Sequence, residues 1–367
     1  MNKLYELYLS DCESKEVTPA EKHMYRDIFN HEFNIEFQKP KKDLCDVCYE
    51  FDHLVNPSEE LKENYNKHLE WKTATKEERK QDRENDSPKI AVVCIDLENV
   101  ISLPKANVGN FYYKRKLSQY NLTGHCSLNK KGYCVLWHEL MAGRGGNDIA
   151  SAVTCMLERI LADVPGIETF ILWFDSCVPQ NRNSYMSAAL REFLAKHPEI
   201  KVIEQKFCEP GHSSIQEVDN IHSQIDRALG PAEIFSPLGL LWTLLGVNRR
   251  NPFAVIQLQL QHIKAFNQVA ASLKYKDVPY FSVKSLLYRA QNPDHISYKV
   301  SFTRNYKEVR LGKSQKTRST NQTLLPMVYA KILKNDTVVS VPKKKDIESM
   351  YRYMPPIDVA FYKTILK

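Results

Sequence analysis

Two aspartates stand directly after short apolar runs that have the composition of buried strands. Asp96 ends the run AVVCID, and Asp175 ends the run ILWFD. If these strands are parallel neighbours, both carboxylates emerge at the carboxyl edge of the sheet, where ligands of α/β proteins bind. Two carboxylates a few ångströms apart repel each other, and a shared divalent cation relieves that repulsion. The pattern therefore predicts a Mg²⁺ or Mn²⁺ site, although a single aspartate after a strand is more often a turn or helix-capping residue.

A third acidic ligand is expected from the segment GHSSIQEVDNIHSQID, whose apolar spacing predicts a helix over residues 213–229. The apolar residues that should face the sheet are Val218, Ile221 and Ile225. The polar residues are Glu217, Asn220 and Gln224 on one flank and Asp219, His222 and Asp226 on the other. We favour Asp219 because His222 follows one turn later and adds a second ligand or phosphate contact to that flank. Glu217 is the alternative.

Cys45 and Cys48 form a Cys-x-x-Cys pair, which is half of the ligand set of a structural zinc ion. No second Cys-x-x-Cys and no closely spaced histidine pair completes it. The partners that the chain offers are His68, His53, His31 and Cys12. His68 is favoured because it lies on the next predicted helix, and a pair of free thiols is the alternative. A redox pair is disfavoured because no thioredoxin-like βαβ unit follows.

Basic residues recur at every third position near the C-terminus. The series is Arg304, Lys307, Arg310, Lys313 and Lys316, followed by Arg318. A spacing of three does not place side chains on one face of a strand, so the series is expected to span a hairpin and an exposed tail. Neutralising about six DNA phosphates would give a slope of log K against log salt near −5. The alternative is a solvated basic face.

The composition of the 367-residue chain is that of a globular protein, with 43% hydrophobic and 26% charged residues, which excludes wholesale disorder, collagen and coiled coil. The net charge of +7 is unevenly distributed, at −6 over residues 1–90, −1 over 91–230 and +14 over 231–367. A basic end predicts a polyanionic partner, with DNA as the first candidate. The longest apolar stretch, residues 235–247, is too short to span a bilayer, so no membrane partner is expected.

The N-terminal segment MNKLYELYLSDCESK is too acidic and too interrupted for a secretory signal. The nine cysteines do not suggest a disulfide framework. A reducing compartment is therefore expected, namely the nucleus or, alternatively, the cytoplasm.

The elements that must position these residues follow from the spacing of apolar residues. Strands are expected over residues 90–95, 112–126, 132–139, 168–174 and 200–207, and helices over 145–161, 181–195 and 213–229. Asn181 is expected to cap the second of these helices. The order β-β-β-α-β-α-β-α predicts an α/β fold with a mixed five-stranded sheet and helices on both faces.

Two further regions flank this predicted domain of residues 90–230. Residues 1–89 are expected to be α-rich, with a strand-like segment over 34–37 and a charged linker helix over 59–86. Residues 231–367 are expected to form a basic α+β region. Its predicted elements are helices over 238–247, 251–273 and 343–353 and a hairpin of residues 296–302 and 308–311.

In this order of strands and motifs the chain resembles the RNase H-like, DDE-type transposase superfamily, and more narrowly the transposon-derived proteins abundant in insect and other animal genomes. The resembling segments, which span residues 20–367, are FNIEFQKPKKDLCDVC, CIDLENVISLPK, YYKRKLSQYNLTGHC, GYCVLWHE, WFDSCVPQNRN, EQKFCEPGHSSIQEVDNIHSQID and KKKDIESMYRYMPPIDVAFY. The resemblance implies an RNase H-like sheet and a two-metal phosphoryl-transfer site. Asp96 and Asp175 match the first two acids of that family, and Asp219, or alternatively Glu217, matches the third.

Two functions of different classes follow from this resemblance. The first is a nuclear, transposase-derived protein that cleaves or transfers DNA strands with Mg²⁺ or Mn²⁺. The second is a catalytically inactive, domesticated DNA-binding or assembly protein that keeps the same domain, because the N-terminus contains no recognisable DNA-binding module. A homo-oligomer is compatible with either function.

Overall fold

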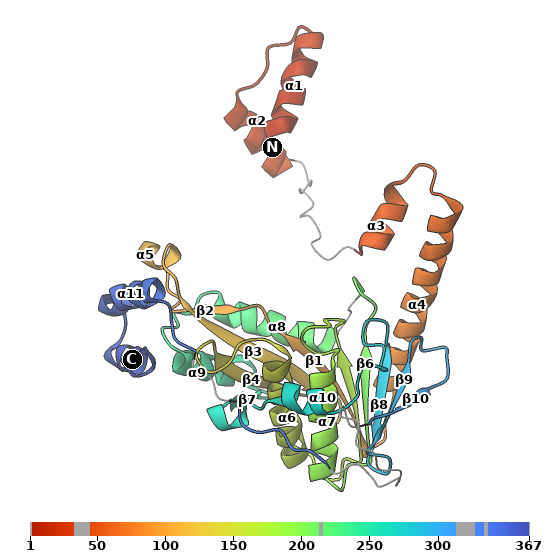
Figure 1. Ribbon diagram of the computed structural model, residues 1–367. Coiled ribbons are helices and arrows are strands. Elements are labelled where there is room, and N and C mark those ends of the chain that lie inside the picture. Colours follow the sequence, from red (N-terminus) through yellow and green to blue (C-terminus); the bar gives the residue numbers. More distant parts are fainter. Residues whose placement is uncertain (1, 33–44, 213–215, 313–326, 334–336, 367) are drawn as a thin grey trace. The chain divides into compact units, whose positions relative to one another are not determined.

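The computed structural model describes residues 2–32, 45–212, 216–312, 327–333 and 337–366 (Figure 1). The chain divides into two compact units, residues 1–44 and residues 45–367, and each is described by itself. The larger unit joins parts of all three regions expected from the sequence, 1–89, 90–230 and 231–367, because strands and helices from each of them belong to it.

The described part of the smaller unit, residues 2–32, contains two helices, α1 (Asn2–Ser14) and α2 (Lys22–Glu32). The rings of Tyr5, Tyr8 and Tyr25 cluster between them, with centroids 4.8–6.0 Å apart. The Tyr5 hydroxyl donates a hydrogen bond to the carbonyl oxygen of Ala20 and so fixes the connection between the helices. The expected strand over residues 34–37 lies outside the described residues.

The larger unit is built on one mixed sheet that contains ten strands among the described residues. They are β1 (Ile90–Leu97), β2 (Ile101–Leu103), β3 (Leu117–Cys126), β4 (Lys131–His138), β5 (Thr169–Phe174), β6 (Val202–Phe207), β7 (Ala254–Gln257), β8 (Ser285–Arg289), β9 (His295–Lys299) and β10 (Lys307–Arg310). Their order across the sheet is β10-β9-β8-β6-β5-β1-β3-β4-β7, and β2 pairs with β3. The predicted α/β class with a mixed sheet is therefore confirmed.

The five strands expected from the sequence form the centre of this sheet. β1, β3 and β4 run antiparallel in succession, while β5 pairs parallel with β1 and β6 parallel with β5. The sheet is nevertheless wider than five strands, because β7 adds parallel to β4 and β8 adds antiparallel to β6. The strand expected over residues 112–126 begins only at Leu117, since residues 109–112 form a short helix, α5 (Gly109–Tyr112).

Helices cover both faces of the sheet (Figure 1). The remaining helices are α3 (Asp46–His53), α4 (Glu59–Arg83), α6 (Gly146–Asp163), α7 (Ser184–Lys196), α8 (Gln216–Leu229), α9 (Pro237–Val247), α10 (Phe266–Ser272), α11 (Val341–Met350) and α12 (Pro356–Ile365), with 3₁₀ turns η1 (Leu260–His262) and η2 (Tyr351–Tyr353). On one face, α6, α7 and α10 bury the largest apolar core. On the other face, Ile221 and Ile225 of α8 pack with Leu240 of α9 against Cys134 and Leu136 of β4.

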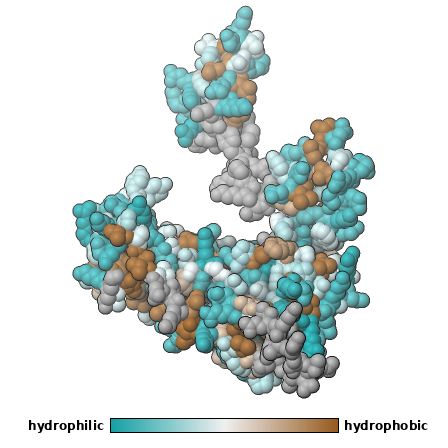
Figure 2. All heavy atoms as spheres, in the orientation of Figure 1, coloured by the Kyte–Doolittle hydropathy of each residue, from teal (hydrophilic) through white to brown (hydrophobic). Residues whose placement is uncertain are grey.

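The charged helix α4 confirms the prediction of a helix near residues 59–86, but it is not a solvated linker. Hydrophilic residues cover most of the face seen in Figure 2, yet Arg79 and Asp82 are buried. Asp82 accepts hydrogen bonds from the Trp173 indole at 2.8 Å and from the Lys206 ammonium at 2.8 and 3.0 Å. A helix with so few apolar residues can dock on a sheet because the sheet itself offers buried partners for its charges.

The C-terminal expectations have a mixed outcome. The hairpin is confirmed, since β9 and β10 pair antiparallel, and so are helices near residues 238–247 and 343–353. The single helix expected over residues 251–273 is wrong, because β7, η1 and α10 occupy that range. Apolar and polar residues alternate strictly from Ile256 to Gln261, which is the two-residue period of an extended chain rather than that of a helix.

Candidate metal sites

Asp96 and Asp175 lie near each other because β1 and β5 pair in parallel. These strands pair in parallel from Ile90 opposite Thr169 to Cys94 opposite Trp173. Asp96 lies two residues beyond Cys94, and Asp175 follows Phe174, the last residue of β5. The negative charge of Asp175 acts on the Asp96 carboxylate. The two carboxylates therefore stand at the carboxyl ends of neighbouring parallel strands and interact electrostatically.

Helix α8 brings a third acid and an imidazole to the same place. One ligand atom each from Asp96, Asp219 and His222 lie within 4.8 Å of one another. Asp219 and His222 are three residues apart and therefore share one flank of α8. Among the described residues, Nε2 of His222 is a buried atom that has no hydrogen-bond partner. Two carboxylate oxygens and an imidazole nitrogen suit a divalent transition-metal ion, whereas Mg²⁺ is bound mainly by oxygen ligands.

The electrostatics of the cluster favour an added cation. Burial, followed by the negative charges of Asp175 and Asp219, raises the pKa of Asp96 to about 7, against a lowering contribution from the Leu97 backbone N–H, which donates to Asp96 Oδ1 at 2.8 Å. Burial also lowers the pKa of His222, so that its neutral form is favoured. A divalent ion bound beside the neutral imidazole would offset the repulsion among these carboxylates.

Asp175 is held by Asn181, which was expected to cap a helix. The side-chain amide of Asn181 donates to Asp175 Oδ1. The residue that caps α7 is Asn183, whose Oδ1 accepts from the backbone N–H groups of Tyr185 and Met186. The expectation that Asn181 caps this helix is therefore wrong, because the helix begins three residues later than its apolar pattern suggested.

Glu217, the alternative third acid, is engaged by helix α4. Its carboxylate forms ion pairs of 2.6 Å with Arg79 and with Arg83. Burial raises its pKa, but the hydrogen bond from Arg83 and the two positive charges outweigh burial and lower the pKa to about 2. The structure thus brings Asp219 to Asp96 and directs Glu217 toward two arginines.

Glu98 is an acidic neighbour that sequence reasoning missed. It is buried just beyond β1, and Asn121 donates a 2.7 Å hydrogen bond to its Oε2. Burial and the charges of Asp226 and Asp96 raise its pKa to about 7, against the lowering effect of Asn121. The sequence does place Glu98 two residues after Asp96. Because alternate residues of an extended chain point to the same side, this spacing could have indicated that Glu98 lies near Asp96.

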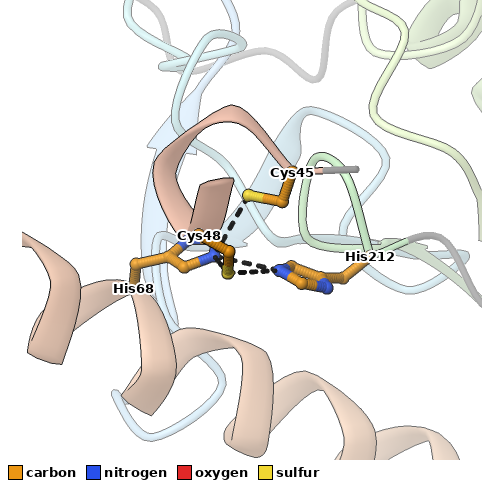
Figure 3. Close-up of side chains that lie close together, drawn as sticks. All are labelled: Cys45, Cys48, His68 and His212. Atoms are coloured by element: carbon orange, nitrogen blue, oxygen red, sulfur yellow. Dashed lines mark hydrogen bonds between the residues drawn. The ribbon is translucent and has the colours of Figure 1, made fainter. Parts of the chain in front are cut away.

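A second cluster joins the Cys-x-x-Cys pair to two histidines (Figure 3). The Nε2 atom of His68 lies 3.3 Å from the sulfur of Cys45 and 3.4 Å from that of Cys48. His68 is therefore brought to the cysteines as expected. The fourth member is His212, whose Nε2 lies 3.4 Å from Cys48 Sγ and 3.0 Å from His68 Nε2.

Of the other partners considered for the cysteines, His53 is not part of this cluster. His53 is exposed, and its Nδ1 lies 2.8 Å from the backbone oxygen of Tyr49. Cys12 and His31 belong to the other unit of the chain. His212 was missed because it lies 144 residues from His68 in the sequence, and the only local signal was its position in the GHSS segment before α8.

Only half of the basic series lies within the described residues. Arg304, Lys307 and Arg310 are exposed, and Arg310 pairs with Asp294 at 3.0 Å. Lys313, Lys316 and Arg318 lie outside the described residues.

Arg304 lines a cleft of about 1280 Å³ between α4 and the sheet. Other residues that line it include Trp71, Arg182, Glu209, Phe281 and Lys284. Asp175 and Arg182 interact electrostatically, which links one end of this cleft to the carboxylate cluster.

Comparison of the chain with models of known protein families and with curated protein sequences gives no match. Within the described ranges, no helix has both the length and the apolar character needed to cross a bilayer.

Proposed function

We propose that residues 90–230, within the unit of residues 45–367, form an RNase H-like domain of the DDE-transposase type that catalyses divalent-metal-dependent phosphoryl transfer on DNA. The observation that carries the proposal is the parallel pairing of β1 with β5, which brings the charge of Asp175 near Asp96, together with Asp219 of α8 within 4.8 Å of Asp96. Three carboxylates from a central strand, its parallel neighbour and a covering helix are what a two-metal phosphoryl-transfer site requires.

The strand order supports the RNase H-like assignment. The run β6-β5-β1-β3-β4 has an antiparallel meander of β1, β3 and β4, with β5 and β6 parallel to β1. This is the arrangement that the resemblance to DDE-type transposases implies. The added strands β7 to β10 lie outside this run and leave its order unchanged.

Each side chain would have a distinct task in the reaction. Asp96, Asp175 and Asp219 would bind the cations, and Asn181 would orient the Asp175 carboxylate through its amide. Divalent ions bound there would lower the pKa of water or a DNA 3′-hydroxyl and stabilise the leaving oxygen. The buried Arg182, which interacts with Asp175, would add positive charge near the phosphate that undergoes transfer.

The cleft lined by Arg304 fits a nucleic-acid strand. It combines cationic side chains, which suit phosphates, with the exposed rings of Trp71 and Phe281, on which bases can stack. A protein that acts on DNA in this way would work in the nucleus or, alternatively, in the cytoplasm.

A catalytically inactive DNA-binding or assembly protein is the second candidate. It is favoured by the composition of the described metal-ligand group, which contains Asp96, Asp219 and His222 but not Asp175. In this case the cleft and the basic residues would bind DNA without cleaving it.

Nicking of supercoiled plasmid and strand transfer of oligonucleotides, each with Mg²⁺ or Mn²⁺, test the proposal. We expect both activities in the native protein and neither in Asp175→Asn, which keeps the shape of the side chain but removes its charge. Asp277→Asn, an exposed turn residue, serves as the matched control. Absence of cleavage together with salt-sensitive DNA binding would favour the inactive candidate, and nicking that survives in Asp175→Asn would refute the proposed site.

A further inference from the structure

We propose that Cys45, Cys48, His68 and His212 bind a structural Zn²⁺ ion that fastens the α3–α4 hairpin to the loop preceding α8. The two cysteines flank the start of α3, His68 lies in α4, and His212 lies in the loop after β6 (Figure 3). The inference concerns residues outside the carboxylate cluster and does not depend on the proposed DNA chemistry.

The spacing of the four ligand atoms fits tetrahedral zinc. With Zn–N near 2.0–2.1 Å and Zn–S near 2.3 Å, tetrahedral ligands lie roughly 3.3–3.8 Å from one another. The structure has 3.0 Å between the two Nε2 atoms and 3.3 to 3.4 Å for three sulfur–nitrogen pairs. These distances equal, or are slightly shorter than, those between the ligands of a bound tetrahedral ion.

The ligand set is that of a closed, structural site. Two thiolates and two imidazoles fill the four positions that Zn²⁺ takes in structural sites, so that none is left for water or substrate. Cys45 and His68 are buried, and Cys48 and His212 are partly buried. Thiolates and imidazoles bind Zn²⁺ in preference to Mg²⁺ or Ca²⁺, which prefer oxygen ligands.

The surroundings of the cluster support a metal ligand role for His68. Its second ring nitrogen, Nδ1, lies 3.6 Å from Glu209 Oε1, and Glu209 in turn pairs with Lys284 at 2.5 Å. A carboxylate behind a histidine fixes the orientation of the ring and increases the basicity of the nitrogen that faces the metal.

The loop that carries His212 is shaped to approach Cys45. Gly211 has a φ of +72°, and a Cβ atom at this position would lie 2.8 Å from both Cα and Cβ of Cys45. A residue with a side chain would be strained there and would also push the loop away from the cysteine. The close approach brings a histidine that lies 164 residues after Cys48 in the sequence to the Cys-x-x-Cys pair.

The proposed zinc ion would also affect the position of helix α8. The α4 helix already holds α8 through the Arg79 and Arg83 ion pairs to Glu217. A zinc ion on His212 would add a second attachment a few residues before α8 begins. Together they would fix the start of the helix that carries Asp219 and His222.

Metal analysis of the purified full-length chain tests the inference. We expect an equimolar amount of zinc in the native protein and in the control His262→Ala, and loss of that zinc in His212→Ala. Circular dichroism shows whether each variant is folded. The absence of zinc from native protein, or native zinc content in His212→Ala, would overturn the proposal.

A second measurement keeps the test independent of how the variants fold and of the carboxylate cluster. When Co²⁺ replaces the metal in the native chain, a tetrahedral site with two cysteines gives intense visible bands and a sulfur-to-cobalt charge-transfer band. We expect both bands in native protein and in Asp219→Asn. A spectrum without the charge-transfer band would exclude the cysteines as ligands, whether or not the protein cleaves DNA.

Discussion

The Cys/His cluster and the Asp/His cluster of the larger unit differ in nearly every property that governs metal binding. The Cys/His cluster offers four ligands, two thiols and two imidazoles, which all favour zinc. They are close together and buried or partly buried. The Asp/His cluster offers two carboxylates and one imidazole, with Asp219 exposed and the negative charge of Asp175 nearby. A full set of protein ligands suits a structural ion, whereas an incomplete set leaves room for water and substrate oxygens.

The two clusters are also assembled by different parts of the fold. Pairing of β1 with β5 brings Asp175 near Asp96, and α8 needs only to pack on that sheet to add Asp219. The Cys/His cluster instead needs a loop and a helical hairpin to meet across 144 residues of sequence. The carboxylates therefore depend on the core of the domain, and the proposed zinc would stabilise an attachment at its periphery.

The largest effect is expected from neutralising Asp219, the acidic residue that α8 contributes to the Asp/His cluster. Asp219→Asn should lower the rate of DNA nicking about 10³-fold, because metal-ion stabilisation of the transition state contributes several kcal/mol and each 1.36 kcal/mol is tenfold. Glu217→Gln should change the rate of the folded protein less than about tenfold. Its main effect should be a loss of about 2–3 kcal/mol of stability, since it leaves the buried Arg79 without its charged partner.

Single-turnover nicking rates and urea unfolding of both variants measure this difference. The reverse result, with Glu217→Gln inactive and Asp219→Asn active, would move the third acid to the other flank of α8.

Zinc removal should affect stability before it affects chemistry. Extraction with a strong zinc chelator is expected to lower the free energy of unfolding by about 4 kcal/mol, the stabilisation given by a ligand present at a thousand times its Kd. Removing Mg²⁺ alone should abolish nicking and leave the unfolding midpoint nearly unchanged, because a cation held by few protein ligands binds weakly. Thermal unfolding after each treatment distinguishes the loss of zinc from the loss of Mg²⁺. Equal shifts of the unfolding midpoint would contradict the assignment of a structural role to the Cys/His cluster alone.

The sequence could predict those features that arise from short-range pattern. The strands ending at Asp96 and Asp175 have buried apolar runs, and the flank carrying Asp219 and His222 follows from helical spacing. His212 could not be predicted as a zinc ligand, because its approach to Cys45 depends on how a distant loop closes on the finished sheet. The docking of α4 was hidden for a similar reason, since its charged residues find buried partners only after β5 and β6 have paired.

Asn181 should affect metal binding at the carboxylates without being a metal ligand itself. Asn181→Ala removes the amide that holds Asp175 Oδ1, and loss of such an outer partner typically costs 10–100-fold in metal affinity or activity. The readout is the Mn²⁺ concentration that gives half-maximal nicking, which should rise. Asn183→Ala is the matched control, because it removes the α7 cap and about 1 kcal/mol of stability but leaves Asp175 held. An equal rise in both variants would show that the effect is structural.

The smallest effect is expected at Gly211, where the backbone of the loop approaches Cys45 of the Cys/His cluster. Gly211→Ala places a methyl group at a φ of +72° and 2.8 Å from the Cys45 backbone, which should cost about 1–3 kcal/mol of stability and speed the release of zinc. Gly166→Ala separates the two causes, because Gly166 has a φ of +91° with nothing within 4 Å of its added Cβ. It should lose stability yet keep its zinc. If both variants release zinc at the native rate, the close approach of Gly211 to Cys45 is not what holds His212 in the cluster.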